Sequence, residues 1–359
     1  MNTVGIYIHV PFCAKKCPYC DFYSCTYDLT TVEQYTDAVI RDIKNLPENI
    51  CTDTVYFGGG TPSLLPVDML NKIIDALKHQ CRIINPEITL EVNPCTVTEK
   101  KLLQYITIGI NRLSFGVQSV HDDELKFLGR MHSWEKAKKI INSAQSIGFK
   151  NISCDVIIGL PEQNIDKIKT TFNKIAELSV QHISAYILKI EENTPFNTPD
   201  IINTLPDDDH VSDLYLFMVE ELQKLGYIQY EISNFSKIGF ESKHNLKYWK
   251  CQDYIGLGPS AHSCFNGKRY CISPDLNKYL NSTEKIITDE NACNDDEKIM
   301  LRLRLTEGIN INDFPYKKDL FLKKAKLFQK LGLVNIENNC VKLTSEGFLV
   351  SNSIINEFI

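Results

Sequence analysis

The sequence predicts an α/β protein: a partial, TIM-like (β/α)6 barrel followed by a small C-terminal domain of the winged-helix type. Over residues 1–232, short β-branched or aromatic runs alternate with segments whose apolar residues recur every three or four positions. Such alternation is typical of βαβ units built around a parallel sheet. From residue 291 onward the order changes to helices followed by a hairpin, which indicates a separate small domain.

Six barrel strands are predicted, at Val4–Val10, Thr54–Phe57, Ile88–Val92, Arg112–Val117, Ile152–Ile158 and His182–Leu188. Between them, helical spacing of apolar residues marks segments 35–46, 70–77, 137–147 and 165–178. A further helix is expected from the acidic run at 206–209 to Leu225, and a last strand at 227–232. In such barrels the functional groups lie at the carboxyl ends of the strands.

We divide the chain into a barrel (1–235), an irregular connecting segment rich in aromatics, Gly and Asn (236–290), and the C-terminal domain (291–359). That domain is expected to contain helices at 296–305 and 319–331, a hairpin within 333–343, and a final helix at 345–358 with Ser345 as its cap. A lysine cluster on the second helix is interpreted as a solvated face rather than a phosphate-binding surface: Lys317, Lys318, Lys323, Lys324, Lys326 and Lys330.

Composition narrows the classes of function. With 43% hydrophobic and 23% charged residues, the chain has an ordinary globular composition, which excludes wholesale disorder. A net charge of −6 disfavours binding to nucleic acid. Because no apolar stretch approaches the ~20 residues of a transmembrane span and no secretory leader opens the chain, we expect a cytoplasmic protein.

Cysteine is the unusual component, with thirteen residues in a chain too large to need disulfide bonds. Three occur in Cys13-Ala-Lys-Lys-Cys17-Pro-Tyr-Cys20, directly after the first predicted strand. Three thiolates on one loop can ligate three irons of a [4Fe-4S] cluster, leaving the fourth iron open to S-adenosylmethionine (SAM). The alternative is a zinc loop completed by His9 or a remote cysteine, although zinc sites prefer paired Cys-x2-Cys knuckles.

A glycine run after the second predicted strand agrees with the SAM interpretation. In Phe57-Gly58-Gly59-Gly60-Thr61-Pro62, the glycines let backbone groups approach a ligand such as the methionine amine closely. The run lacks the Lys-Ser/Thr ending of a phosphate-binding loop.

Together with Glu91-Val-Asn-Pro94, Gly116-Val-Gln-Ser119 and Asp155-x3-Gly-Leu-Pro161, these motifs resemble a radical SAM family. That family contains oxygen-independent coproporphyrinogen III oxidase (HemN) and its relative, the heme chaperone HemW. The resemblance covers nearly the whole chain and implies a radical SAM barrel with Cys13, Cys17 and Cys20 as cluster ligands. It also implies eight SAM contacts: Tyr7, Gly59, Gly60, Thr61, Glu91, Gln118, Arg130 and Asp155.

Two departures separate the branches of this family. The oxidase pattern places a fourth cysteine at position 22, where this chain has Phe22. The oxidases also carry a longer segment before the motif than the twelve residues that precede Cys13. Both features favour the chaperone branch and disfavour coproporphyrinogen oxidase activity.

A second motif, His244-Asn245-Leu-Lys-Tyr248-Trp249, is similar to one implicated in heme binding in the chaperone branch. A neutral imidazole ligates heme iron well, and aromatic rings can pack on a porphyrin. We therefore predict His244 as the heme ligand and His262, which follows a glycine-containing loop, as the second candidate.

The leading hypothesis is a heme chaperone that binds a SAM-capped [4Fe-4S] cluster and heme, and transfers heme to acceptor hemoproteins. The first alternative is coproporphyrinogen III oxidase. The second is a radical SAM enzyme acting on RNA, which the net charge disfavours. The resemblance is compatible with SAM cleavage, a reductant for the cluster, a homodimer and peripheral membrane association through a partner.

Overall fold

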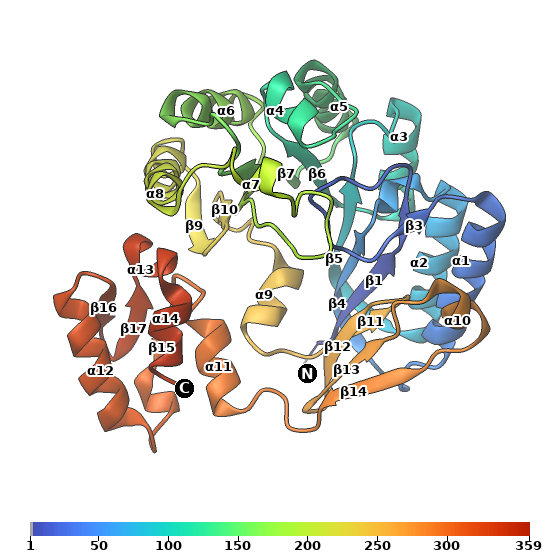
Figure 1. The fold of residues 1–359 in the computed structure, drawn as a ribbon. Coiled ribbons are helices and arrows are strands. Elements are labelled where there is room, and N and C mark those ends of the chain that lie inside the picture. Colours follow the sequence, from blue (N-terminus) through green and yellow to red (C-terminus); the bar gives the residue numbers. More distant parts are fainter. Residues whose placement is uncertain (1–2) are drawn as a thin grey trace.

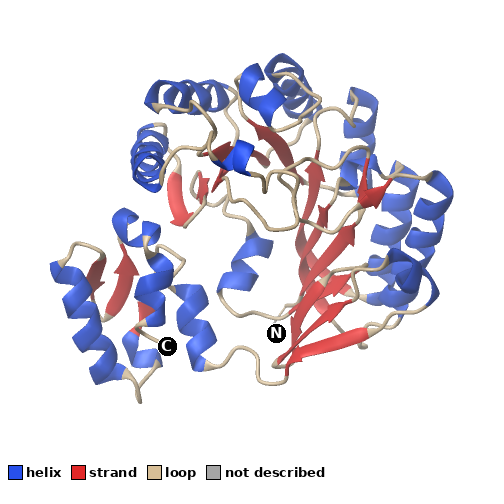
Figure 2. Ribbon diagram, viewed as in Figure 1, coloured by secondary structure: helices blue, strands red, loops and turns tan. Residues whose placement is uncertain are grey.

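The computed structural model describes residues 3–359 (Figure 1). Its centre is a run of six parallel strands, adjacent in the order β1, β4, β5, β6, β7 and β8. These strands span Gly5–Val10, Cys51–Gly59, Arg82–Val92, Arg112–Gln118, Ile152–Ile158 and His182–Ile187. They curve into an open barrel with helices around its outside (Figure 2). The predicted partial (β/α)6 barrel is confirmed.

The outer helices pack apolar stripes against the sheet. The longer ones are α1 (Leu29–Lys44), α2 (Val67–Gln80), α3 (Glu99–Ile108), α5 (Trp134–Ile147), α6 (Ile165–Glu177) and α8 (Asp208–Lys224). Of these, α3 was not predicted, because Leu103 and Ile106 are exposed and only Leu102 and Tyr105 are buried, so its apolar pattern is irregular. The shorter elements of the loops are β2 (Phe12–Cys13), β3 (Cys25–Thr26), η1 (Pro62–Leu64), α4 (Asp122–Phe127) and α7 (Pro199–Ile202).

The prediction of an irregular segment at 236–290 was wrong. After β9 (Ile228–Glu231), the chain forms β10 (Asn234–Ser236), α9 (Lys243–Trp249), β11 (Tyr254–Leu257), β12 (His262–Phe265), β13 (Lys268–Ile272), α10 (Leu276–Asn281) and β14 (Lys285–Asp289). Strand β11 pairs in parallel with β1, and β12, β13 and β14 continue the sheet beyond it. With β10 and β9 at the opposite edge, this sheet has twelve strands within residues 3–359. All four of its residues are buried, so it lacks the alternation that marks a half-buried strand.

The C-terminal part contains α11 (Asp295–Arg302), β15 (Ile309–Asn310), η2 (Ile311–Asp313), α12 (Lys318–Lys330), β16 (Val334–Glu337), β17 (Cys340–Leu343), α13 (Ser345–Leu349) and α14 (Ser351–Asn356). Its hairpin turns at Asn338 and Asn339, whose φ angles of 49° and 64° suit asparagine in a tight turn. The predicted cap Ser345 was wrong: Thr344 accepts the Gly347 N–H, and the expected single helix is divided at Val350.

The barrel lumen is polar and is built in layers. Strand register places Tyr7, Tyr56, Thr89 and Arg112 side by side in a lower layer. A middle layer contains Glu91, Ser114, Ser153 and His182, and an upper layer contains Gly116, Asp155 and Ser184. The intervening residues, among them Ile6, Val55, Leu90 and Leu113, are buried on the opposite face of the sheet, where the helices pack. Polar residues therefore collect inside the barrel.

Helix α9 lies at the open side of the barrel, between the strands and the C-terminal part (Figure 1). Its first amides, those of Lys243 and His244, donate to Glu87 of β5 at 3.0 and 3.4 Å. Lys250, which follows the helix, pairs with Glu307 at 3.2 Å. No helix among residues 3–359 has the length and apolar character needed to span a bilayer.

Gly258 provides a test of how β11 is joined to the barrel. Its φ is +97°, and a Cβ atom there would lie 2.5 Å from the backbone oxygen of His9. Gly267 also has a positive φ, +73°, but a Cβ atom on it would have no other atom within 4 Å. Gly258→Ala should therefore be destabilised well beyond the ~1–2 kcal/mol expected for a left-handed alanine, whereas Gly267→Ala should show only that cost.

Urea unfolding of both variants beside the wild type measures this difference in the free energy of unfolding. Equal losses in the two variants would show that the contact between Gly258 and His9 is not tight.

Candidate cofactor site at the barrel mouth

A cavity of about 430 Å³ opens at the carboxyl ends of the barrel strands, within the range of volumes that hold small ligands. Its wall includes the three cysteines of the triplet and seven of the eight predicted SAM residues: Gly59, Gly60, Thr61, Glu91, Gln118, Arg130 and Asp155. Predicted site residues as far apart in the sequence as Cys13 and Asp155 thus line one cavity. Strand-end placement, predicted from the barrel pattern, explains their convergence.

The cysteine loop forms one side of this cavity. All three thiols are partly accessible, and Cys13 Sγ lies 3.6 Å from Thr61 Oγ1 of the glycine run. Burial, together with the neighbouring Cys17 and Cys13, raises the pKa of Cys20. A cationic metal cluster would reverse that effect because it favours the thiolate form of the cysteines. Binding of such a cluster to this loop should therefore release protons.

The zinc alternative requires a fourth ligand beside the three cysteines. Residues 3–359 contain no preformed group of three or more His, Cys, Asp or Glu side chains that could hold a metal ion, and this applies to the cysteine triplet as well. His9, the proposed fourth ligand, instead contacts Tyr7 and Tyr23: its Nε2 lies 2.9 Å from the Tyr23 carbonyl oxygen and its Nδ1 3.1 Å from the Tyr7 hydroxyl.

The glycine run packs so tightly that side chains would not fit. A Cβ atom on Gly59, whose φ is +109°, would lie 2.7 Å from the His9 ring, and one on Gly60 would lie 3.1 Å from Cys13 Sγ. The amides of Gly60 and Thr61 donate to the carbonyls of Val10 and Phe12, each at 2.8 Å. These bonds hold the run against the cysteine loop, as a cluster with an adjacent ligand requires.

Two carboxylates stand on the opposite wall. Glu91 accepts from the Tyr56 hydroxyl at 3.0 Å, and Asp155 accepts from the Ser114 hydroxyl at 3.0 and 3.1 Å. Burial and the neighbouring Asp155 raise the pKa of Glu91 to about 7. Burial likewise raises the pKa of Asp155, although the serine hydroxyls counteract the effect. Both groups are suited to accept hydroxyl or ammonium donors of a ligand.

Arg130 and Gln118 complete the wall near the cysteines. One Arg130 nitrogen, Nη2, donates to the Gly116 carbonyl at 2.8 Å, Nη1 lies 3.5 Å from Cys17 Sγ, and Nε has no partner among the described residues. Gln118 has a φ of 67°, an uncommon conformation for a residue with a side chain, which marks functional positions in many proteins. Arg130 thus offers a free donor beside the cysteine loop for a ligand carboxylate.

Tyr7 differs from the other predicted SAM residues because it does not line this cavity. Its ring lies in the lower layer near Tyr56 and His244, with centroid distances of 6.2 and 6.3 Å. Burial raises the pKa of Tyr7, and its hydroxyl contacts His9. In this structure the Tyr7 ring lies next to Tyr56, which lines the cavity, and does not reach the cavity itself.

His244, the predicted heme ligand, is completely buried, with 0% exposure. Its Nδ1 lies 2.9 Å from the Thr54 hydroxyl and its Nε2 2.8 Å from the Tyr248 hydroxyl. Burial and the nearby Lys247 lower the pKa of His244 to about 3, so the ring is neutral. The imidazole therefore has the protonation state that iron needs, but neither nitrogen is free in this conformation.

His262, the second candidate, is exposed at the start of β12, and burial together with Arg269 lowers its pKa. It does not line the cavity at the barrel mouth. The structure thus separates the two histidines: one is enclosed beneath the lumen and the other is open to solvent.

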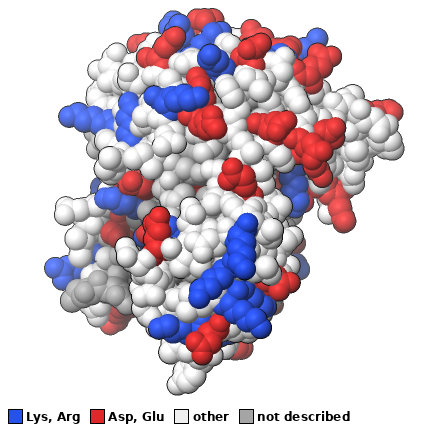
Figure 3. All heavy atoms as spheres, turned by 90° about the vertical axis from the view of Figure 1, so that its left-hand side faces the viewer, with Lys and Arg blue, Asp and Glu red and all other residues white. Residues whose placement is uncertain are grey.

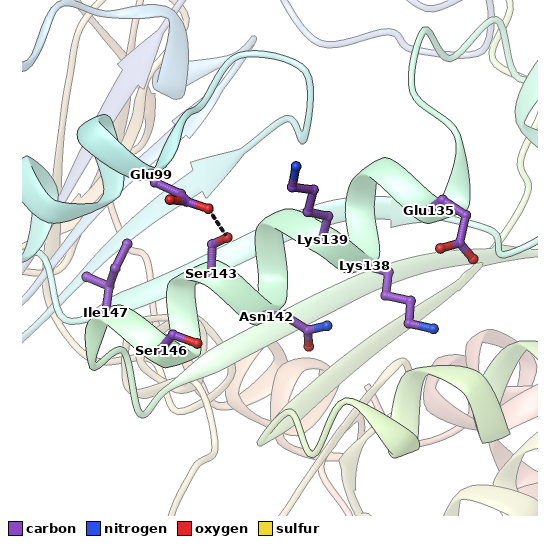
Figure 4. Close-up of a pocket in the computed structure, with 8 residues that line it drawn as sticks. All are labelled: Glu99, Glu135, Lys138, Lys139, Asn142, Ser143, Ser146 and Ile147. Atoms are coloured by element: carbon purple, nitrogen blue, oxygen red, sulfur yellow. Dashed lines mark hydrogen bonds between the residues drawn. The ribbon is translucent and has the colours of Figure 1, made fainter.

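Two surface features, a hollow against α5 and the charged face of the C-terminal part, show no arrangement of the described residues that indicates a reaction. A second hollow of about 470 Å³ lies outside the barrel against α5, and its wall combines charges of both signs with a Ser143–Glu99 hydrogen bond of 2.9 Å (Figure 4). On the C-terminal part, lysines and arginines gather with acidic residues among them (Figure 3). Lys317 pairs with Asp296 and Lys324 with Glu357, which agrees with a solvated helix face.

Among the polar residues of the cavity wall that the sequence-based analysis did not predict are Tyr56, Arg112 and Asn245. Tyr56 and Arg112 occupy strands that were predicted, so their alternation with apolar neighbours could have placed them in the lumen. Asn245 comes from α9, for which no sequence signal indicated contact with the barrel.

Comparison with known proteins agrees with this geometry. The family model of the radical SAM superfamily matches residues 7–175, and that of the HemN C-terminal domain matches residues 296–350. The heme chaperone HemW of Bacillus subtilis is 32% identical over 98% of both chains. HemW of Haemophilus influenzae is 38% identical, covering 88% of this chain and 86% of its own.

Among solved structures, the coproporphyrinogen III oxidase HemN of Escherichia coli superposes with a TM-score of 0.82. The match covers 99% of this chain and 90% of that one at 22% identity, which establishes a shared fold. The long, full-length matches to curated chaperones exceed 30% identity. The chain therefore belongs to the HemW family of heme chaperones, within the radical SAM superfamily.

Proposed function

We propose that this chain is a heme chaperone that holds a SAM-capped [4Fe-4S] cluster, binds heme and delivers it to acceptor hemoproteins. The observation that carries the proposal is the cavity at the barrel mouth, where the cysteine triplet meets the glycine run and two carboxylates. Similarity over most of the chain to proteins named heme chaperone supports heme as the molecule that is bound and transferred. When bound, the cluster supplies an electron and an open iron position.

In this proposal each residue of the cavity has a defined task. Cys13, Cys17 and Cys20 hold the cluster, and Arg130 donates to the carboxylate of SAM. Glu91 and Asp155 accept its ribose hydroxyls or ammonium group. The backbone of Gly59, Gly60 and Thr61 fits closely against the methionine end, and Gln118 closes the same wall.

Heme ligation by His244 requires a movement of α9. Because both ring nitrogens are hydrogen-bonded and the side chain is fully buried, iron can reach the imidazole only if the Tyr248 or Thr54 bond breaks. We therefore propose that α9 swings away from the barrel when heme binds. Tyr248 and Trp249 leave with the helix and become available to pack on the porphyrin.

Coproporphyrinogen III oxidase is the alternative that the HemN-like fold allows, since likeness at 22% identity concerns the fold alone. Phe22 argues against it. This residue occupies the position of the fourth oxidase cysteine, lines the cavity and is 61% exposed. An exposed aromatic ring at the mouth fits a protein that contacts a flat apolar ligand better than it fits an additional thiolate.

The cytoplasmic location stays a prediction. A homodimer, a reductant for the cluster and peripheral membrane association through a partner likewise remain predictions.

Cys17→Ala should prevent full cluster assembly, because two thiolates of the loop cannot replace three. Iron and sulfide content and visible absorbance after anaerobic reconstitution measure the effect. Cys340→Ala, in the C-terminal hairpin, is the matched control and should assemble the cluster like the wild type. Full iron and sulfide in Cys17→Ala would remove the cluster assignment.

Heme titration followed in the Soret band tests the histidine. We expect one saturable site per chain that weakens at least tenfold in His244→Ala. Tyr248→Phe should instead bind heme about five- to tenfold more tightly, because one hydrogen bond of about 1 kcal/mol no longer competes with iron.

His262→Ala serves as the control for the exposed histidine. If His262→Ala weakens binding and His244→Ala does not, the ligand assignment moves to His262 and α9 need not open. Non-saturating curves for all proteins would contradict heme binding itself.

A further inference from the structure

Arg112 is buried in the lower lumen without a direct partner among the described residues. It is 1% exposed at the start of β6, and its Nε and Nη1 atoms have no hydrogen-bond partner there. Lys247, another buried cation, differs because it pairs with Asp53 at 2.9 Å. An unpaired buried guanidinium is costly, so its retention calls for a function.

The Arg112 side chain is packed among Tyr56, Tyr230 and Glu87 and also forms part of a cavity wall. Arg112 lines the same hollow as Glu91 and Asp155, and Thr89, its neighbour in register on β5, also has an unpaired buried hydroxyl within residues 3–359. The unpaired guanidinium atoms of Arg112 at the cavity wall are suited to bind ordered water. The positive charge of Arg112 is therefore not neutralised by one partner and can act on several groups in the lumen.

Three carboxylates surround this one buried cation, and each is hydrogen-bonded to other groups. Glu87 accepts the amides of Lys243 and His244 from α9. Glu91 is bonded to Tyr56, and Asp155 to the serines Ser114 and Ser153. Since none of the three forms a direct ion pair with Arg112, its charge acts on all of them through space.

The other cations of the cavity wall stand elsewhere. Arg130 lies beside Cys17, and Lys15, Lys16 and Lys189 are exposed to solvent. Arg130 is itself largely buried but is bonded to the Gly116 carbonyl beside the cysteine loop, and the charges of the exposed lysines are screened more strongly than a buried charge. Arg112 is thus the cation placed to balance the carboxylates inside the barrel.

We propose that Arg112 is a positioning residue for the SAM site, whose charge favours the ionised forms of Glu91 and Asp155 in the ligand-free protein so that they can receive SAM. The inference rests on the SAM part of the proposed function and extends it to a residue two layers below the cavity mouth. It also explains why the guanidinium lacks a direct partner: a single tight ion pair would leave less of its charge for the other carboxylates.

The titration of Glu91 depends on groups from every neighbouring element. Tyr7 of β1, Tyr56 of β4, Asp155 of β7 and Tyr248 of α9 face it, and Arg112 is the cation among them. Burial and Asp155 raise its pKa to about 7, while Arg112 acts in the opposite direction.

Asp155 is faced by Arg112, Tyr186 and Cys154, and by the hydroxyls of Ser114, Ser153 and Ser184. Removing the positive charge of Arg112 therefore raises both carboxyl pKa values further and leaves more of each acid protonated at neutral pH.

The first experiment needs no ligand. The C=O stretch of protonated carboxyl groups is followed by infrared spectroscopy from pH 5 to 10, in wild type and Arg112→Gln, with Glu91→Gln to assign the Glu91 band. The Glu91 midpoint should rise by about one pH unit in Arg112→Gln, the shift expected for a unit charge nearby at an effective dielectric of about 20. Arg112→Lys, which keeps the charge, should titrate like the wild type.

The second experiment measures SAM affinity of the anaerobically reconstituted protein over the same pH range. Wild-type affinity should rise through pH 7 as Glu91 ionises. In Arg112→Gln the rise should occur about one unit higher, so that affinity at pH 7 falls about fivefold and recovers at pH 9. Arg41→Gln, a cation removed from outside the lumen, should leave the profile unchanged.

Identical midpoints for Arg112→Gln and the wild type would overturn the proposal, as would a loss of affinity that high pH does not restore. If Arg112→Gln does not fold, Arg112→Met replaces it, because methionine is an unbranched side chain without charge. Its Glu91 midpoint should also rise, and an unchanged midpoint would contradict the role of Arg112. If the wild type binds no SAM, the SAM assignment of the proposed function fails, while the infrared comparison still decides whether Arg112 controls the carboxylates.

Discussion

The structure depends on providing hydrogen-bond partners for the polar groups buried inside the barrel. The lumen contains a buried arginine, three acids, several tyrosines and two histidines, in a space that most proteins fill with apolar side chains. Each buried ion or hydroxyl requires a partner, since leaving it unpaired costs about 1–3 kcal/mol or more. The arrangement persists because hydrogen bonds run from layer to layer, and it leaves open donors only where a cavity begins.

Helix α9 is the element through which this interior meets the rest of the chain. A series of hydrogen bonds leads from Asp155 through Ser153 and His182 to Tyr230, whose hydroxyl accepts the amide of Ser242 at the helix start. The same helix places His244 against Thr54 and is followed by Lys250, which pairs with Glu307. Displacement of α9 thus alters both the floor of the cofactor cavity and the contact with the C-terminal part. If heme binding displaces α9 as proposed, this helix couples the binding of heme to the binding of the cofactor.

The sequence alone was sufficient for the barrel and for most of the cofactor wall. Strands such as Ile152–Ile158 were placed correctly because their outer residues are apolar and their ends carry functional groups. Cys13, Cys17 and Cys20 were predicted as a group from their spacing, and they line one cavity together with seven of the eight residues predicted to contact SAM.

The failures have physical causes. Strand β11 is buried on both faces and only four residues long, and α3 exposes two of its apolar residues. The burial of His244 and the isolation of Arg112 depend on contacts between segments more than 100 residues apart, such as Thr54 with His244. A local pattern cannot encode such contacts, and the motif that named His244 gave no indication that both its nitrogens are bonded.

The most direct test of the account is hydrogen exchange at the α9 amides with and without heme. In the heme-free protein the Lys243 and His244 amides are bonded to Glu87 beneath the barrel, so they should exchange slowly. Stoichiometric heme should raise exchange across 243–249 in the wild type and leave it unchanged in His244→Ala. Protection that persists throughout α9 while heme binds in a His244-dependent manner would contradict the account.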